Sequence, residues 1–358
     1  MDLTKYLCTE VPEIRVHGRI SNRKTKGIPL FWSAAAIEFN VTGTELWLEY
    51  TCTGDAYLRV EIDGFDMYRF PIDVGTHKVC IMRGLAAEQV KNVRIFRETA
   101  ALVSTLITCD ALYSDGEFKT LPERKYKIEA FGDSVTAGEG LAGASSMTEW
   151  SPAVFSSRGH YVLTVAKAFD ADWSIVAHGG WGVFTDYKNN REHAVPKEYD
   201  YVYGTNETPE ATELGARDIF DVENDRTNIT IINLGANDSN AYNENAEAWI
   251  DENGLSHKLK RPDDLHYIVD AFYNFCANIR KRNQNTIILL CHNTLTDALD
   301  PQIIEAAEKF KQDTGDDKIY TVCLPRATAE LKGSRHHPGA KAHERFAEAI
   351  ITKLKEIL

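Results

Sequence analysis

The sequence predicts two domains, an N-terminal all-β sandwich similar to a jelly roll and a C-terminal α/β domain whose parallel sheet is flanked by helices. The chain has 358 residues, whereas a single hydrophobic core stops growing at about 250–300 residues. Its first third alternates apolar and polar residues with the period of strands, and the remainder alternates strand-like apolar runs with stretches of helical period. We place the sandwich at residues 1–115, a linker at 116–126 and the α/β domain at 127–358.

The strands of the first domain are short and separated by turn residues. In residues 57–62, apolar side chains occupy alternate positions, as in a half-buried strand. Asp63-Gly64 follows at once and readily supplies the positive φ angles of a tight turn, so we expect a hairpin into residues 65–70. Similar alternations occur at residues 45–50, 78–82 and 93–96. Regular short strands of this kind are typical of a β-sandwich.

The pattern changes near Ser114-Asp115-Gly116, and the polar stretch at residues 122–125 is typical of a linker. Beyond it, strand-like and helix-like runs alternate at residues 127–131, 161–169, 173–177, 229–234, 265–279, 286–291, 302–310, 319–324 and 340–358. Strands so uniformly apolar must be covered on both faces, which indicates a parallel sheet between layers of helices.

Charge and cysteine content exclude several classes of partner. The formal net charge is −13, so we expect neither nucleic acid nor an anionic membrane as a partner. The seven cysteines are odd in number and scattered, which disfavours disulfides and a zinc site. The first residues lack the basic and apolar regions of a signal peptide, and no apolar run is long enough to span a membrane. We therefore expect a cytoplasmic protein with free thiols.

Polar residues with catalytic potential follow the expected strands. Ligands of open α/β sheets bind at the carboxyl ends of the strands, so these positions are the ones to inspect. Taken singly, each has a structural explanation, because Asp and Ser are favoured helix caps and Gly permits tight turns. Their combination favours a catalytic site. The segments are Gly132-Asp133-Ser134, His178-Gly179-Gly180-Trp181-Gly182, Gly235-Ala236-Asn237-Asp238 and His336-His337-Pro338.

These segments resemble the sequence blocks of the SGNH, or GDSL-type, hydrolases. The matches are Gly132-Asp133-Ser134 for the nucleophile block, Gly235-x-Asn237-Asp238 for the asparagine block and His337-Pro338 for the histidine block. The glycine block is the loosest match. Placing residues 179–182 over the glycine-containing turn of the family selects Gly182, with Gly180 as the alternative.

The resemblance implies a serine esterase. Ser134 would attack an ester carbonyl after His337 removes its proton, and water would hydrolyse the resulting acyl-enzyme. The backbone N–H groups of Ser134 and Gly182 and the side-chain amide of Asn237 would form the oxyanion hole. Such a mechanism needs no metal and no other cofactor.

The sequence departs from the family pattern just before the histidine. Most SGNH enzymes carry an aspartate three residues before it, which orients the imidazole, but here that position is Ser334. We expect a serine–histidine dyad whose ring is held by a backbone carbonyl; a carboxylate from elsewhere in the chain is the alternative. His337 is the expected base because a proline follows it, as in the family. Asp133 and Asp238 are expected to brace their loops.

The β-sandwich, the Gly-Asp-Ser block and the missing aspartate together resemble the second family of carbohydrate esterases. That resemblance implies release of acetyl groups from mannan, glucomannan or xylan, and in a cytoplasmic protein the substrate would be imported oligosaccharides. Trp181 is a candidate platform for a sugar ring, although core packing explains it nearly as well. The alternatives are a short-chain acyl esterase or thioesterase, a lipid esterase, and a glycan-binding protein with an inactive hydrolase domain. For the β-domain, three roles stay open. It would bind glycan, form one side of the active-site cleft, within the chain or across a possible homodimer, or only support the fold.

Overall fold

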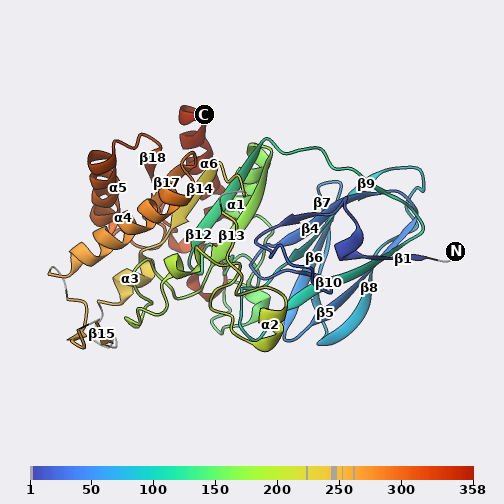
Figure 1. Cartoon of the computed structure of the whole chain (residues 1–358), viewed down its shortest axis with the longest axis horizontal. Coiled ribbons are helices and arrows are strands. Elements are labelled where there is room, and N and C mark those ends of the chain that lie inside the picture. Colours follow the sequence, from blue (N-terminus) through green and yellow to red (C-terminus); the bar gives the residue numbers. More distant parts are fainter. Residues whose placement is uncertain (1–2, 223–224, 243–247, 252, 261–262) are drawn as a thin grey trace. The chain divides into compact units, whose positions relative to one another are not determined.

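The computed structural model describes residues 3–222, 225–242, 248–251, 253–260 and 263–358. The chain forms two compact units (Figure 1). The first comprises Met1–Arg124, Ser151–Ser157 and Asp200–Phe220, and the second comprises Lys125–Trp150, Arg158–Tyr199 and Asp221–Leu358. Within the described ranges, no helix combines the length and the apolar character that crossing a membrane would require.

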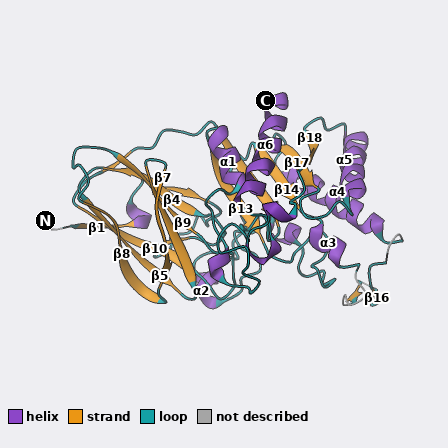
Figure 2. Ribbon diagram, turned by 180° about the vertical axis from the view of Figure 1, so that it is seen from behind, coloured by secondary structure: helices purple, strands orange, loops and turns teal. Residues whose placement is uncertain are grey.

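The first unit is built from antiparallel strands (Figure 2). They are β1 (Thr4–Leu7), β2 (Arg15–His17), β3 (Ile28–Pro29), β4 (Ala36–Val41), β5 (Glu45–Cys52), β6 (Ala56–Ile62), β7 (Phe65–Ile72), β8 (Gly75–Arg83), β9 (Lys91–Arg97), β10 (Ile107–Ser114) and β11 (Phe118–Lys119). One sheet has the order β1-β10-β5-β8, with β3 paired to β10, and the other has the order β11-β4-β9-β6-β7, with β2 paired to β4. All the strand segments predicted in this region lie within β5 to β9.

The two sheets share one hydrophobic core, which makes the unit a β-sandwich as predicted. Leu48 and Cys109 from one sheet and Phe39 and Leu58 from the other are all buried in this core. The predicted hairpin between β6 and β7 turns at Asp63 and Gly64, with φ angles of 52° and 82°. Two consecutive positive φ angles are what a two-residue turn between twisted strands requires, and Asp-Gly supplies them at low cost.

The second unit contains one parallel sheet. Its strands are β12 (Tyr126–Gly132), β13 (Ala171–Ala177), β14 (Ile229–Asn233), β17 (Ile287–His292) and β18 (Ile319–Cys323), in the order β13-β12-β14-β17-β18. This is the doubly wound order in which the direction of winding reverses between the first and third strands along the chain. Those two strands are β12 and β14, and their carboxyl ends are neighbours because Gly132 pairs with Asn233.

Helices cover both faces of this sheet (Figure 1). They are α1 (Tyr161–Ala168), α4 (Leu265–Arg282), α5 (Asp300–Thr314) and α6 (Ala340–Ile357), with the short α3 (Ala236–Asn240) after β14. Helix α1 packs against α6 on one face, and α4 packs against α5 on the other. In α4, the apolar stripe expected from its spacing is buried and includes Ile268, Phe272 and Ile279. Beside this sheet, β15 (Trp249–Ile250) and β16 (Ser256–His257) form a two-stranded hairpin.

Two segments that we placed in the C-terminal domain belong to the first unit instead. Ser151–Ser157 and Asp200–Phe220, which contains α2 (Pro209–Glu213), belong to the first unit. Polar contacts hold the longer segment there: the Trp32 indole N–H donates to the Val202 carbonyl at 2.7 Å. The stretch predicted as a linker contains β11, which pairs with β4. Hydrophobic periodicity does not register such contacts between distant polar groups.

Candidate active site

Ser134 lies in the turn that follows β12, and only 7% of the residue is exposed. The strand ends at Gly132, where a Cβ atom would lie 2.0 Å from the Thr136 hydroxyl oxygen, so only glycine fits. The Glu139 N–H donates to the Ser134 carbonyl at 3.0 Å, which closes the turn. The serine therefore sits on a tightly held turn at the switch point of the sheet, where ligands of this architecture bind.

His337 contacts Ser134 directly. Its Nε2 atom lies 2.8 Å from the Ser134 Oγ, and its Nδ1 atom lies 2.9 Å from the backbone carbonyl oxygen of Arg335. A carbonyl oxygen can only accept, so Nδ1 carries the proton and Nε2 is free to accept from the serine hydroxyl. His336, by contrast, is exposed. The structure thus brings the two predicted dyad residues together, with a backbone carbonyl on the far side of the ring.

Glu139 is a neighbour of the imidazole that sequence reasoning missed. Its side chain is buried, with 5% exposed, and its Oε1 atom lies 3.7 Å from the His337 Nδ1. The same oxygen accepts a hydrogen bond from the Arg335 Nε. Sequence reasoning looked for a carboxylate just before the histidine, but this one lies five residues after the serine. The available signal was an acidic residue in the turn of residues 133–139, called the nucleophile turn below after the predicted role of Ser134.

The structure does not support the predicted oxyanion role of Gly182. Its N–H donates to the Thr185 carbonyl at 2.8 Å and is therefore not available to a ligand. The backbone N–H groups of Ser134, Gly179 and Gly180 make no hydrogen bond within the described part of the chain. Gly179 lies against Ser134, since a Cβ atom on it would be 3.7 Å from the Ser134 Cβ.

Gly182 has a packing role instead. A Cβ atom on this residue would lie 2.0 Å from a carboxylate oxygen of Asp238. That carboxylate accepts backbone N–H groups from Val183 at 2.9 Å, Phe184 at 2.8 Å and Thr185 at 3.1 Å. Burial raises the pKa of Asp238 to about 6, and the three N–H groups oppose the rise. Asp238 thus braces the loop of residues 179–185, called the glycine loop below.

Asp133 and Asn237 meet between β12 and β14. The Asn237 Nδ2 donates to the Trp181 carbonyl at 2.9 Å and lies 3.5 Å from the Asp133 Oδ2. The other carboxylate oxygen of Asp133 accepts the Val135 N–H at 3.0 Å. Burial raises the pKa of Asp133 to about 7, helped by the nearby charge of Asp238. The amide of Asn237 is therefore oriented by a carbonyl at the predicted edge of the sheet.

The ring of Trp181 is partly buried. Its centroid lies 4.8 Å from that of the His193 ring, with 14° between the planes, and 4.1 Å from that of His178. These histidines lie beside Asp186 and Glu198, at 2.9 Å and 3.1 Å. The ring thus already packs against imidazoles, and its use as a sugar platform stays a prediction.

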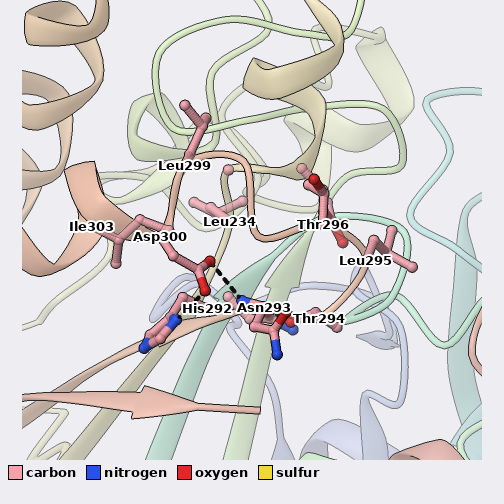
Figure 3. Close-up of a pocket in the computed structure, with 13 residues that line it drawn as sticks. Leu234, His292, Asn293, Thr294, Leu295, Thr296, Leu299, Asp300 and Ile303 are labelled. Atoms are coloured by element: carbon pink, nitrogen blue, oxygen red, sulfur yellow. Dashed lines mark hydrogen bonds and ion pairs between the residues drawn. The ribbon is translucent and has the colours of Figure 1, made fainter. Parts of the chain in front are cut away.

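A small cavity beside Asp133 is lined by residues of the β14 and β17 loops (Figure 3). The Asp300 carboxylate faces the His292 imidazole at 2.8 Å and accepts the Asn293 N–H at 3.1 Å. The cavity volume is about 10 Å³, which is far too small for a sugar ring. Among the described residues, no group of three or more His, Cys, Asp or Glu side chains is placed to hold a metal ion.

Known families match the chain in two parts. The GDSL-like lipase/acylhydrolase family matches residues 128–350, which include Ser134, Asn237 and His337. The chain therefore belongs to this family of carboxylic-ester hydrolases, the class that its sheet and its serine–imidazole pair also define. The carbohydrate esterase 2 N-terminal family matches residues 16–118. The two-domain architecture is accordingly that of the family 2 carbohydrate esterases.

Curated relatives of the chain are carbohydrate esterases or deacetylases by name. The cellulase/esterase CelE of Acetivibrio thermocellus is 23% identical over 354 residues, which are 97% of this chain and 40% of that protein. An acetylxylan esterase / glucomannan deacetylase of Cellvibrio japonicus is 27% identical over 253 residues, which are 68% of this chain and 63% of that protein. The chain thus spans less than two thirds of either relative.

Solved structures extend the similarity over the whole chain. An acetyl xylan esterase from the rumen bacterium Butyrivibrio proteoclasticus has a TM-score of 0.94 and 30% identity, covering 99% of this chain and 98% of that one. A family two carbohydrate esterase from Clostridium thermocellum, in complex with cellohexaose, has a TM-score of 0.81 and 21% identity, covering 96% and 98%. At 21% identity, the second similarity concerns the fold alone.

Proposed function

We propose that this protein is a carbohydrate O-acetylesterase that removes acetyl groups from hemicellulose-derived oligosaccharides by a serine acyl-enzyme mechanism. The observation that carries the proposal is the contact of 2.8 Å between the Ser134 Oγ and the His337 Nε2. The chain that carries this contact belongs to a family of ester hydrolases. A solved structure 30% identical to it is that of an acetyl xylan esterase by name.

In the proposed reaction, His337 takes the hydroxyl proton on Nε2 while Ser134 attacks the acetyl carbonyl carbon. The carbonyl of Arg335 accepts from Nδ1 throughout and so stabilises the imidazolium that forms. Collapse of the tetrahedral intermediate releases the sugar hydroxyl, which takes the proton back from Nε2. A water molecule, deprotonated by the same nitrogen, then attacks the acyl carbon. Collapse breaks the bond to the Ser134 Oγ, which takes the proton back from Nε2, and acetate is released.

The oxyanion of both tetrahedral intermediates needs several donors. We assign these to the backbone N–H groups of Ser134 and of the Gly179-Gly180 turn and to the side-chain amide of Asn237. One N–H of that amide is held by the Trp181 carbonyl at 2.9 Å, and the other makes only a long contact of 3.5 Å with Asp133, which an oxyanion would replace. This set differs from the sequence prediction by replacing Gly182, whose N–H is engaged with Thr185. Each donor of this kind is typically worth about 10²–10³ in rate.

The substrate class follows from the relatives rather than from the geometry of the site. One relative is a glucomannan deacetylase and acetylxylan esterase by name, so acetylated gluco- or manno-oligosaccharides and xylo-oligosaccharides are the candidates. A polar sugar leaving group also accords with histidine, aspartate and tryptophan side chains beside the glycine loop.

The test is acetate release from acetylated manno- and xylo-oligosaccharides by wild type, Ser134→Ala, His337→Asn and His336→Asn. His336 is the matched control, because it is the adjacent imidazole, is exposed and has a left-handed backbone that asparagine tolerates. We expect wild type and His336→Asn to be active and the other two to lose about 10³-fold or more while retaining their unfolding temperature.

A series of p-nitrophenyl esters of increasing acyl length separates the competing functions. Activity confined to acetyl esters supports the proposal. Preference for long acyl chains, without acetate release from oligosaccharides, would instead assign a lipid esterase or thioesterase with the same dyad. Activity that survives Ser134→Ala would refute the serine mechanism altogether.

A further inference from the structure

We propose that Glu139 and Arg335 form a positioning clamp that holds the His337 ring against Ser134 and balances the charge beside it. The clamp consists of the buried Glu139 carboxylate and the Arg335 guanidinium that donates to it through Nε. The inference rests on the proposed function, because it concerns the regulation of the same imidazole. Neither side chain takes part in the proton transfer between Ser134 and His337, although the Arg335 backbone carbonyl accepts from the ring.

The backbone at Arg335 needs such support. Arg335 and His336 have φ angles of 53° and 59°, so two successive residues that are not glycine adopt the left-handed conformation. This conformation directs the Arg335 carbonyl at the His337 Nδ1, 2.9 Å away. The His337 ring is thus oriented by a backbone conformation that residues other than glycine rarely adopt.

Three contacts from Arg335 hold this peptide in place. Its N–H donates to the Met147 carbonyl at 2.7 Å, its Nη1 donates to the Thr148 carbonyl at 3.0 Å, and its Nε donates to Glu139. The first two partners lie in the exposed loop that follows the nucleophile turn. Of the three partners, only Glu139 offers a buried side-chain carboxylate, and hydrogen bonds of a guanidinium to a carboxylate are the strongest of such contacts.

The loop of residues 333–338, called the histidine loop, also packs closely against the nucleophile turn and the residues that follow it. Gly140 has a φ of 90°, and a Cβ atom on it would lie 2.7 Å from the His337 Cβ. A Cβ atom on Gly333 would lie 1.8 Å from the Gly140 carbonyl oxygen. The Ser334 hydroxyl donates to the Ala142 carbonyl at 2.6 Å. Because the two loops pack this closely, we expect a substitution at Glu139 to change the position of the His337 ring.

The clamp also sets the charge beside the imidazole. Glu139 lies 3.7 Å from Nδ1 and favours the imidazolium, whereas the Arg335 guanidinium that neutralises Glu139 disfavours it. The third titratable group near the ring is His343 of α6, which is buried and whose pKa burial holds well below its ordinary value, so it is uncharged. Glu139 and Arg335 therefore act on the imidazolium in opposite directions.

This opposition gives a test that a purely structural role would not pass. The pH profile of kcat/KM for an acetyl ester is measured for wild type, Glu139→Gln, Arg335→Gln and the double variant. In Glu139→Gln, the acidic limb should move to lower pH by about one unit, because the imidazolium loses a nearby negative charge. A charged group about 4–6 Å away typically shifts a pKa by about 1–3 units, and we expect the smaller value. In Arg335→Gln, which leaves Glu139 uncompensated, the limb should move to higher pH. The double variant should return toward wild type in the position of the limb.

We expect kcat to fall in every variant of the clamp, whereas the acidic limbs of the two single variants should move in opposite directions. Because the ring loses its support in each variant, we expect kcat to fall about 10-fold or more with little change in KM. The matched controls are Glu149→Gln and Arg345→Gln, which replace exposed residues of the adjacent loop and of α6 and should leave both rate and profile unchanged. A ¹⁵N titration of the His337 ring gives the same comparison for any variant too slow to assay.

Three outcomes decide the matter. Limbs that move in opposite directions support the clamp. Limbs that stay at the wild-type position, or that move in the same direction, overturn it, whatever happens to the rate. An inactive wild type, or a Ser134→Ala variant as active as wild type, refutes the proposed function instead, and the ¹⁵N titration then still reports whether Glu139 and Arg335 act on the ring.

Discussion

Replacing Asp133 by asparagine should remove a pH-dependent loss of stability. The Asp133 carboxyl is buried, with 3% of the residue exposed, and burial raises its pKa from 3.8 to about 7. Between these two pH values, the unfolded chain gives up the proton while the folded protein keeps it. The free energy of unfolding therefore falls as pH rises through this window, by about 1.4 kcal/mol per unit and about 4 kcal/mol in all. Above about pH 7 the loss is complete.

Asparagine keeps the acceptor for the Val135 N–H and carries no charge. The difference in unfolding free energy between Asp133→Asn and wild type should thus rise in favour of the variant by about 4 kcal/mol from pH 4 to pH 8. Urea unfolding followed by tryptophan fluorescence at four pH values measures it. The charge of Asp238 is present in both proteins, so most of its effect cancels. A difference that stays constant within about 1 kcal/mol over this range would refute the reasoning.

Three further substitutions test the oxyanion site and the glycine loop. Asn237→Ala should lower kcat by about 10²–10³ with an unchanged unfolding temperature, as steady-state kinetics and thermal melts will show. Gly182→Ala should destabilise the protein by roughly 1–3 kcal/mol in urea unfolding, because its Cβ atom would lie 2.0 Å from the Asp238 carboxylate; no loss would mean that the loop yields freely. Trp181→Ala should raise KM for acetylated oligosaccharides by about 3- to 10-fold and leave KM for p-nitrophenyl acetate unchanged. An equal change for both substrates would argue against a sugar contact.

The predicted strand ends point to the candidate site residues in the sequence. Ser134 and Asn237 each follow a strand whose place in a parallel sheet could be inferred from apolar runs, and parallel strands present their carboxyl ends at one edge. His337 lies just before the last helix and was found from the histidine and proline of its motif. The sandwich was predictable for a similar reason, because the alternation in β5 and β6 records which side chains face the core.

Gly182 and Glu139 were not predictable in this way. Whether a backbone N–H is free depends on the conformation of its loop, and the Thr185 carbonyl that occupies the Gly182 N–H lies three residues on with no sequence signal. Glu139 matters only because Arg335, distant in the chain, folds against it. Both cases concern polar contacts within irregular loops, which hydrophobic periodicity does not record.

Ser334 explains how the site dispenses with the aspartate that most SGNH enzymes carry at this position. Its side chain is buried and donates to the Ala142 carbonyl at 2.6 Å, so it joins the histidine loop to the nucleophile turn instead of contacting the ring. Orientation of the ring falls to the Arg335 carbonyl, which accepts from Nδ1 as a carboxylate would but carries no charge. A neutral acceptor stabilises an imidazolium less than a carboxylate does. In the proposed clamp, the Glu139 carboxylate lies 3.7 Å from the same nitrogen and is paired with the Arg335 guanidinium, so it supplies only part of what the missing aspartate would have provided.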